Sequence, residues 1–224
     1  EDFSWWRKRM EHSARLYDVI RIDHFIGMVK YYAIPAEDED ARNGAWEKGP
    51  GLKLIQVMNE SIGDKKIIAE DLGVQMPEVV KVLEKSGYPG MKVLEFAFDG
   101  NRKNDHLPYY WTQNTVAYGG THDNDTLMGY FTGLQSWELG YVREYMECRN
   151  GSIEDLVDKI FRTAYASVAD LVIFQMQDVL KVGNIGRMNL PSSMGTNWRW
   201  RMLQGQFGPE EIEKLRYLCD IYGR

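Results

Sequence analysis

The stretch RLYDVIRIDHFIG, residues 15–27, ends an apolar run with polar side chains that can carry chemistry. Its apolar residues are typical of a buried strand, Arg21 lies among them, and Asp23 and His24 follow directly. Because Arg21 and Asp23 are two positions apart, their side chains leave a strand on the same face. The stretch therefore predicts a strand whose end presents a cation next to a carboxylate.

Five short apolar runs predict buried strands, and the quoted stretch holds the first of them, Val19–Ile22. The runs do not alternate between polar and apolar residues, which suits strands that are covered on both faces. Helical patterns lie between most of them, so the sequence predicts an α/β fold with a parallel sheet, either open or closed into a barrel. The other four runs are Ile67–Ala69, Val93–Phe98, Thr115–Tyr118 and Leu171–Phe174.

Apolar spacing and prolines at first turns predict the helices. Two long loops, His24–Gly51 and Gly183–Arg201, contain Gly, Asn, Pro and Trp, which is typical of functional lids or rims. Without an internal repeat or linker, residues 1–224 are expected to form one domain. The predicted helices are Leu52–Ile62, Pro77–Lys85, Trp137–Cys148, Ile153–Val168, Asp178–Val182 and Pro209–Tyr222.

The bulk composition is that of an ordinary soluble protein, with 224 residues, 44% of them hydrophobic, and a net charge of −6. The acidic balance predicts no nucleic-acid or membrane partner, since both require a basic face. Cys148 and Cys219 lack metal-ligand spacing and predict reduced thiols in a cytoplasmic protein. The first residue is not Met and residues 1–10 have a helical pattern, so we expect the chain to begin inside a domain.

Carboxylates follow three of the predicted strands at the point where each strand ends. They are Asp23, Glu70 and Asp123, and two of them lie next to a histidine. In parallel α/β folds the functional site lies at the carboxyl ends of the strands. A single carboxylate in this position is often a helix N-cap, which is our interpretation of Asp125. Three carboxylates that each follow a strand predict a functional site.

Paired carboxylates suit the cleavage of a glycosidic bond, in which one protonates the leaving oxygen while the other attacks or activates water. Arg21 would keep Asp23 ionised, as a nucleophile requires, and an apolar setting would keep Glu70 protonated. Metal-assisted hydrolysis, with Asp23, Asp123 and their two histidine neighbours as ligands, is a weaker alternative. No histidine pair has close ligand spacing, and Arg21 would repel a cation.

Six segments together resemble the 4-alpha-glucanotransferases, also called amylomaltase or disproportionating enzyme, of the alpha-amylase superfamily. The resemblance runs in order from about Leu16 to the C-terminus, although residue 26 is Ile where many members have Arg. The segments are RIDHF (21–25), WEKGPG (46–51), AEDLG (69–73), GMKVLEFAFDG (90–100), GTHDNDT (120–126) and RMNLPSSMGTNWRWR (187–201).

The resemblance implies catalytic roles for the three carboxylates. Asp23 corresponds to the nucleophile, Glu70 to the general acid/base and Asp123 to the stabiliser of the transition state. Arg21 and His122 correspond to residues that orient the nucleophile and bind the sugar.

For four further residues the sequence leaves alternatives open or expects no role. Phe96 corresponds to an aromatic on the acceptor side, with core packing as the alternative. Trp46 lines the groove or anchors its loop, and His24 binds substrate or supports Asp23. His106 is expected to be a solvated loop residue.

The resemblance also implies a (β/α)8 TIM barrel, of which the five predicted strands would be strands four to eight. The chain would then be the C-terminal part of the catalytic barrel of a longer enzyme that needs no cofactor or metal. The implied activity moves maltodextrin or starch-type glucan segments to an acceptor. Alternatives are a related α-glucan hydrolase or an inactive glucan-binding fragment. We expect the chain alone to be inactive or feeble, or to self-associate through open barrel edges.

Overall fold

The computed structural model describes residues 2–73 and 76–224. By its internal contacts the chain divides into two compact units, Glu1–Met91 and Lys92–Arg224, which we call the N-terminal and C-terminal units. Each unit has its own cluster of buried apolar side chains. Within the described ranges, every helix is too short or too polar to cross a membrane.

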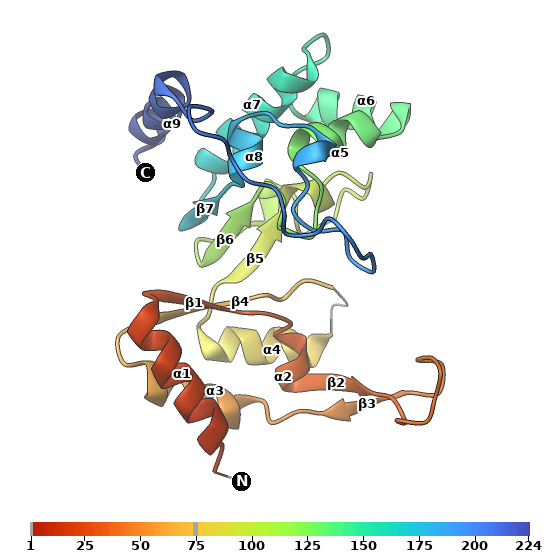
Figure 1. Cartoon of the computed structure of the whole chain (residues 1–224), viewed down its shortest axis with the longest axis vertical. Helices are drawn as coiled ribbons and strands as arrows, with labels where there is room; N and C mark the ends of the chain where they lie inside the picture. Colours follow the sequence, from red (N-terminus) through yellow and green to blue (C-terminus); the bar gives the residue numbers. More distant parts are fainter. Residues whose placement is uncertain (1, 74–75) are drawn as a thin grey trace. The chain divides into compact units, whose positions relative to one another are not determined.

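The N-terminal unit is built around two parallel strands, β1 and β4. They pair in register from Val19 opposite Lys66 to Ile22 opposite Ala69. Helices α1 and α3 lie alongside each other in this unit (Figure 1), with Met10 and Met58 among the residues that fill its core. The elements are α1 (Ser4–Leu16), β1 (Val19–Ile22), α2 (Ile26–Val29), β2 (Lys30–Ala33), β3 (Ala45–Lys48), α3 (Leu52–Ile62), β4 (Lys66–Ala69), α4 (Pro77–Ser86) and the start of β5 (Gly90–Val93).

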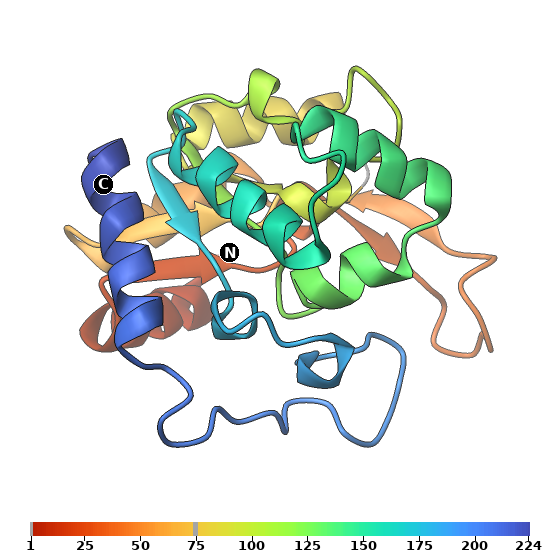
Figure 2. The same ribbon diagram turned by 90° about the horizontal axis from the view of Figure 1, so that it is seen from above.

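The prediction of one long loop from His24 to Gly51 is wrong. The segment contains helix α2 and an antiparallel hairpin, β2–β3, which extends away from the helices of its unit in Figures 1 and 2. Tyr32 is paired with Trp46 in this hairpin, and their rings are 5.4 Å apart, edge to face. Both strands are largely exposed, so no buried face leaves an apolar pattern in the sequence.

The C-terminal unit has a three-stranded sheet in the order β5-β6-β7, with β6 and β7 parallel. Helix α7 packs with α5 and α9 in this unit, and Figure 1 shows them beside one another. The mixed α/β class predicted from the sequence is confirmed. The elements after β5 are η1 (Leu94–Phe96), η2 (Pro108–Tyr110), β6 (Thr115–Tyr118), α5 (Leu127–Gly133), α6 (Ser136–Tyr145), α7 (Ile153–Tyr165), β7 (Leu171–Ile173), α8 (Met176–Val179), η3 (Asn184–Gly186) and α9 (Pro209–Tyr222).

Several predicted boundaries are wrong. The predicted strand Val93–Phe98 ends at Val93 and continues as the 3-10 turn η1, in which Leu94 and Glu95 are buried. Two predicted helices end early because the chain turns into the left-handed backbone region. Glu147 (φ 50°) follows α6, and Lys181 (φ 52°) follows α8. Helix α7 ends at Tyr165, three residues before its predicted end, with a right-handed cap at Ala166.

Candidate active site

Asp23 and Glu70 directly follow the paired strands β1 and β4 of the N-terminal unit. Ile22 and Ala69 are partners in the parallel register, so the residues that follow them leave adjacent strands at the same edge. The backbone N–H of Glu70 donates to the carbonyl of Ile22 at 2.9 Å. The backbone N–H of Phe25 donates to the carbonyl of Glu70, also at 2.9 Å. Asp23 and Glu70 therefore follow two paired strands at the same edge of the sheet.

Asp23 is held by Arg21. A guanidinium nitrogen of Arg21 lies 2.8 Å from Asp23 Oδ1, and the Nε of Arg21 contacts the sulfur of Met91 at 3.3 Å. The side chain of Asp23 remains 73% exposed. The ion pair therefore fixes the direction of the carboxylate, while a reactant can still reach it.

Glu70 is buried, with 9% of its surface exposed, and its carboxylate accepts two backbone hydrogen bonds. The N–H of His24 donates to Oε2 at 2.6 Å, and the N–H of Leu72 donates to Oε1 at 2.8 Å. His24 has a positive φ of 51°, and this unusual backbone conformation accompanies the short contact of its N–H group with Glu70. A main-chain N–H group therefore contacts each oxygen of the buried Glu70 carboxylate. His24 contacts Glu70 through its backbone.

In the C-terminal unit, Asp123 lies in the loop after β6 and is held from three sides. Asn189 Nδ2 donates to Asp123 Oδ1 at 2.6 Å, and a guanidinium nitrogen of Arg187 donates to the backbone carbonyl of Asp123 at 2.7 Å. His122 Nε2 lies 3.3 Å from Asp123 Oδ2. The sequence did not single out Arg187 or Asn189, although both lie in the loop that it marked as functional.

Three partly exposed aromatic side chains are candidates for substrate binding. In the C-terminal unit, Trp198 lies 5.0 Å from the His122 ring and has a left-handed backbone, with φ 65°. Phe96 is 42% exposed among the residues that the structure describes. In the N-terminal unit, Trp46 lies on the hairpin against Tyr32 and is half exposed.

His106 lies in a loop as predicted, but the prediction that it is solvated is wrong. The residue is half-buried, and its Nδ1 accepts the backbone N–H of Val93 at 3.1 Å. Its ring packs edge to face on Phe96, with 5.5 Å between the ring centres. Only the fold of residues 93–106 makes this contact visible, because the sequence gives no reason to pair positions that far apart.

Two carboxyl groups missed by the sequence are buried in the C-terminal unit. Burial, reinforced by the negative charge of Asp178, raises the pKa of Glu95 to about 9. Burial likewise raises the pKa of Asp178 to about 7, although the N–H of Leu127 donates to its Oδ1. Both groups are therefore biased toward the protonated form.

The interpretation of Asp125 as a helix N-cap is wrong. The cap of α5 is Thr126, whose side chain accepts the N–H of Gly129. Asp125 instead accepts hydrogen bonds from the N–H of Thr126 at 2.7 Å and from Asn184 Nδ2 at 2.6 Å. It therefore braces the loop that carries Asp123.

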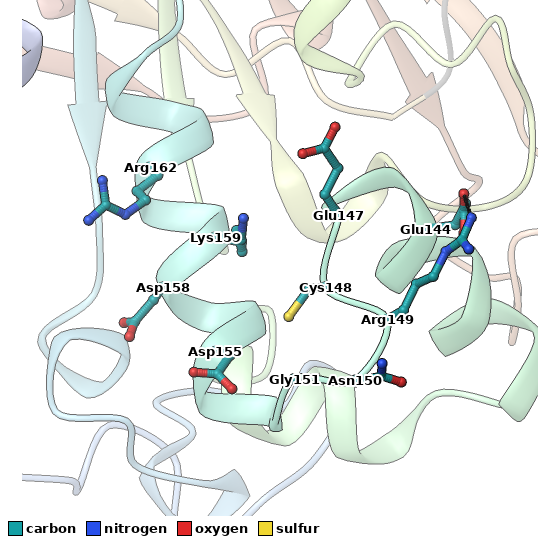
Figure 3. Close-up of a pocket in the computed structure, with 10 residues that line it drawn as sticks. All are labelled: Glu144, Glu147, Cys148, Arg149, Asn150, Gly151, Asp155, Asp158, Lys159 and Arg162. Carbon is teal, nitrogen blue, oxygen red and sulfur yellow. Dashed lines mark hydrogen bonds and ion pairs between the residues drawn. The ribbon is translucent and has the colours of Figure 1, made fainter.

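A recess of about 770 Å³ lies between the end of α6 and α7, and its lining residues include none of the predicted site residues (Figure 3). Charged groups of both signs line it, and many of them are already paired. Arg149 contacts Glu144 at 2.5 Å, and Asp158 contacts Lys181 at 2.9 Å. The recess therefore gives no reason to move the candidate site away from the strand ends.

The sequence of the chain is similar to those of one known protein family. Residues 1–205 match the family described as 4-alpha-glucanotransferase. A 4-alpha-glucanotransferase of Clostridium butyricum is 42% identical over 225 residues, which cover 100% of this chain and 46% of that protein. A 4-alpha-glucanotransferase of Thermus thermophilus is 39% identical over 229 residues, again covering 100% of this chain and 46% of that protein.

A solved structure of a related protein is also similar to this chain. Amylomaltase from Streptococcus agalactiae, in complex with acarbose, is 37% identical in sequence, with a TM-score of 0.93. The match covers 100% of this chain and 45% of that chain. The chain thus spans about half the length of the curated relatives that it matches.

Proposed function

Because the chain belongs to the 4-alpha-glucanotransferase family, we propose that the protein moves α-1,4-glucan segments from a donor maltodextrin to an acceptor. The Arg21–Asp23 ion pair carries this proposal, because it presents an aimed, accessible carboxylate at the strand edge where buried Glu70 also lies. That combination suits a nucleophile beside a general acid/base. The acarbose complex of the Streptococcus agalactiae amylomaltase supports an α-glucan as the substrate class.

The proposed chemistry is a retaining double displacement. Glu70 gives a proton to the glycosidic oxygen while Asp23 attacks the anomeric carbon, and the reducing-side fragment leaves. The 4-hydroxyl of an acceptor glucan then attacks the same carbon, releases Asp23 and passes its proton to Glu70. Asp123 stabilises the transition state.

Five further residues are assigned to binding. Arg21 and His122 orient the nucleophile and bind the sugar, Phe96 lies on the acceptor side, and His24 and Trp46 contact substrate. The half-exposed rings of Phe96 and Trp46 support these roles, because aromatic faces pack well on sugar rings.

The finer fold assignment belongs to the same proposal. We infer that β1, β4, β5, β6 and β7 are strands four to eight of a (β/α)8 barrel and that residues 1–224 belong to one catalytic domain. The TM-score of 0.93 over the whole chain supports this assignment. The free thiols of Cys148 and Cys219 agree with a cytoplasmic location. Unpaired strand edges would favour self-association of the isolated chain.

Incubating the full-length protein with maltotriose tests the proposal. We expect glucose together with maltodextrins longer than maltotriose, and we expect Asp23→Asn to abolish both products because the amide cannot act as the nucleophile. Asp18→Asn is a matched control, since Asp18 is an exposed carboxylate paired with Lys65. Turnover that survives in Asp23→Asn would contradict the mechanism.

The product pattern separates the alternatives. Glucose and maltose alone would identify a hydrolase, and the absence of any product would favour a glucan-binding fragment. Loss of activity on adding a chelator would instead favour metal-assisted hydrolysis, since the proposed mechanism predicts no effect of chelation.

A further inference from the structure

Residues 99–111 fold back onto the segment that carries Phe96 through two side chains. Asn104 Nδ2 donates to the backbone carbonyl of Phe96 at 2.7 Å. His106 Nδ1 accepts the backbone N–H of Val93 at 3.1 Å. The two contacts therefore bracket the 3-10 turn that presents the Phe96 ring, and we call these two side chains the Asn104–His106 clamp.

The clamp is itself firmly held. Asn104 is 8% exposed, and its Oδ1 accepts the backbone N–H of His106 at 2.8 Å. The indole N–H of buried Trp111 donates to the carbonyl of His106 at 2.8 Å. Asp105, which lies between the two clamp residues, forms an ion pair at 2.5 Å with Lys92, the neighbour of Val93. Burying the Asn104 amide without hydrogen bonds would cost free energy. Its two hydrogen bonds therefore favour this one conformation of the segment.

The His106 ring also contacts the Phe96 ring directly. The ring centres are 5.5 Å apart and the planes meet at 77°, an edge-to-face arrangement. Because Nδ1 accepts a hydrogen bond, the neutral imidazole carries its proton on Nε2. Burial lowers the pKa of His106, which favours this neutral form. Phe96 is thus supported through both its backbone and its ring, while 42% of its surface stays exposed.

We propose that Asn104 and His106 are positioning residues that hold the Phe96 ring ready for the acceptor sugar and so favour transfer over hydrolysis. The inference rests on the proposed function, in which Phe96 lies on the acceptor side. Sugar hydroxyl and water compete to break the same bond between Asp23 and the anomeric carbon, and either one passes its proton to Glu70. When the Phe96 ring is already fixed, binding an acceptor sugar loses less side-chain entropy. Water does not pack on the ring, so its reaction is not favoured in this way.

The test compares Asn104→Ala and His106→Ala with the wild type in the full-length protein, using maltotriose as donor. Transfer forms one glycosidic bond for each bond broken, so only hydrolysis increases the number of reducing ends. We expect the ratio of transfer to hydrolysis to fall about three- to tenfold and the KM for an acceptor such as glucose to rise, because the ring must be ordered on binding. Lys103→Ala, an exposed side chain in the same segment, should leave both unchanged.

Phe96→Ala separates a positioning role from a general structural one. If His106 acts through Phe96, the Phe96→Ala/His106→Ala double variant should have the same ratio as Phe96→Ala alone. His106→Asn keeps an oxygen that can accept the Val93 N–H and should recover part of the ratio. If His106→Ala is too unstable to assay, His106→Asn and Asn104→Ser are compared with the wild type instead.

Three results would overturn the inference. If the clamp variants keep the wild-type ratio of transfer to hydrolysis while Phe96→Ala lowers it, the positioning role of Asn104 and His106 is refuted. The proposed function is unaffected by that result. An unchanged ratio in Phe96→Ala would show that the ring does not select the acceptor. A wild-type protein that makes no maltodextrin longer than maltotriose would refute the proposed function and, with it, the inference.

Discussion

Replacing Glu95 by glutamine should change how the stability of the protein depends on pH. Glu95 is 8% exposed, and burial raises its pKa from 4.5 to about 9. Above pH 4.5 the unfolded chain releases this proton while the folded protein keeps it, so stability falls as pH rises, by about 1.4 kcal/mol per pH unit up to about pH 9. Between pH 5 and 8 the wild type should therefore lose about 4 kcal/mol relative to Glu95→Gln.

Urea unfolding at pH 5, 6.5 and 8 measures this difference, because any constant cost of the buried amide cancels between pH values. The titration of Asp178 is present in both proteins and cancels to a first approximation. Glu147→Gln, which changes an exposed carboxylate in the same unit, is the matched control and should follow the wild type. Parallel pH profiles for wild type and Glu95→Gln would refute the reasoning, since they would mean that Glu95 ionises as easily in the folded protein as in the unfolded chain.

Two further predictions concern the loop after β6. Asn189→Ala should lower kcat on maltotriose about tenfold or more, because it removes a 2.6 Å hydrogen bond that aims Asp123; an unchanged initial rate would contradict the positioning of that carboxylate. Gly120→Ala should destabilise the protein by about 1–3 kcal/mol in urea unfolding, because the new methyl group would lie 2.4 Å from Glu95 Oε1. Gly133→Ala, with no atom within 4 Å of the added carbon, should cost nothing, and an equal loss in both would exclude the clash as the cause.

The local part of the candidate site could be predicted because it depends on neighbouring residues. The two-residue period of a strand predicts that Arg21 and Asp23 point to the same side, and the structure pairs them at 2.8 Å, with Asp23 directly after the end of β1. The hairpin that carries Trp46 could not be predicted, since its strands are exposed and leave no apolar period. The burial of Glu95 was equally hidden, because an apolar run does not reveal whether a strand or a turn follows its first residues.

The sequence by itself determined the α/β class and the chain order in which each of the three carboxylates follows a strand, because hydrophobic period and chain order are local properties. Only the tertiary structure decided what surrounds those carboxylates. The backbone N–H of His24 meets Glu70 across 46 positions of the chain, and Asn189 meets Asp123 across 66. Such contacts arise from strand pairing and loop return, and a hydrogen bond between distant residues leaves no periodic pattern in the sequence.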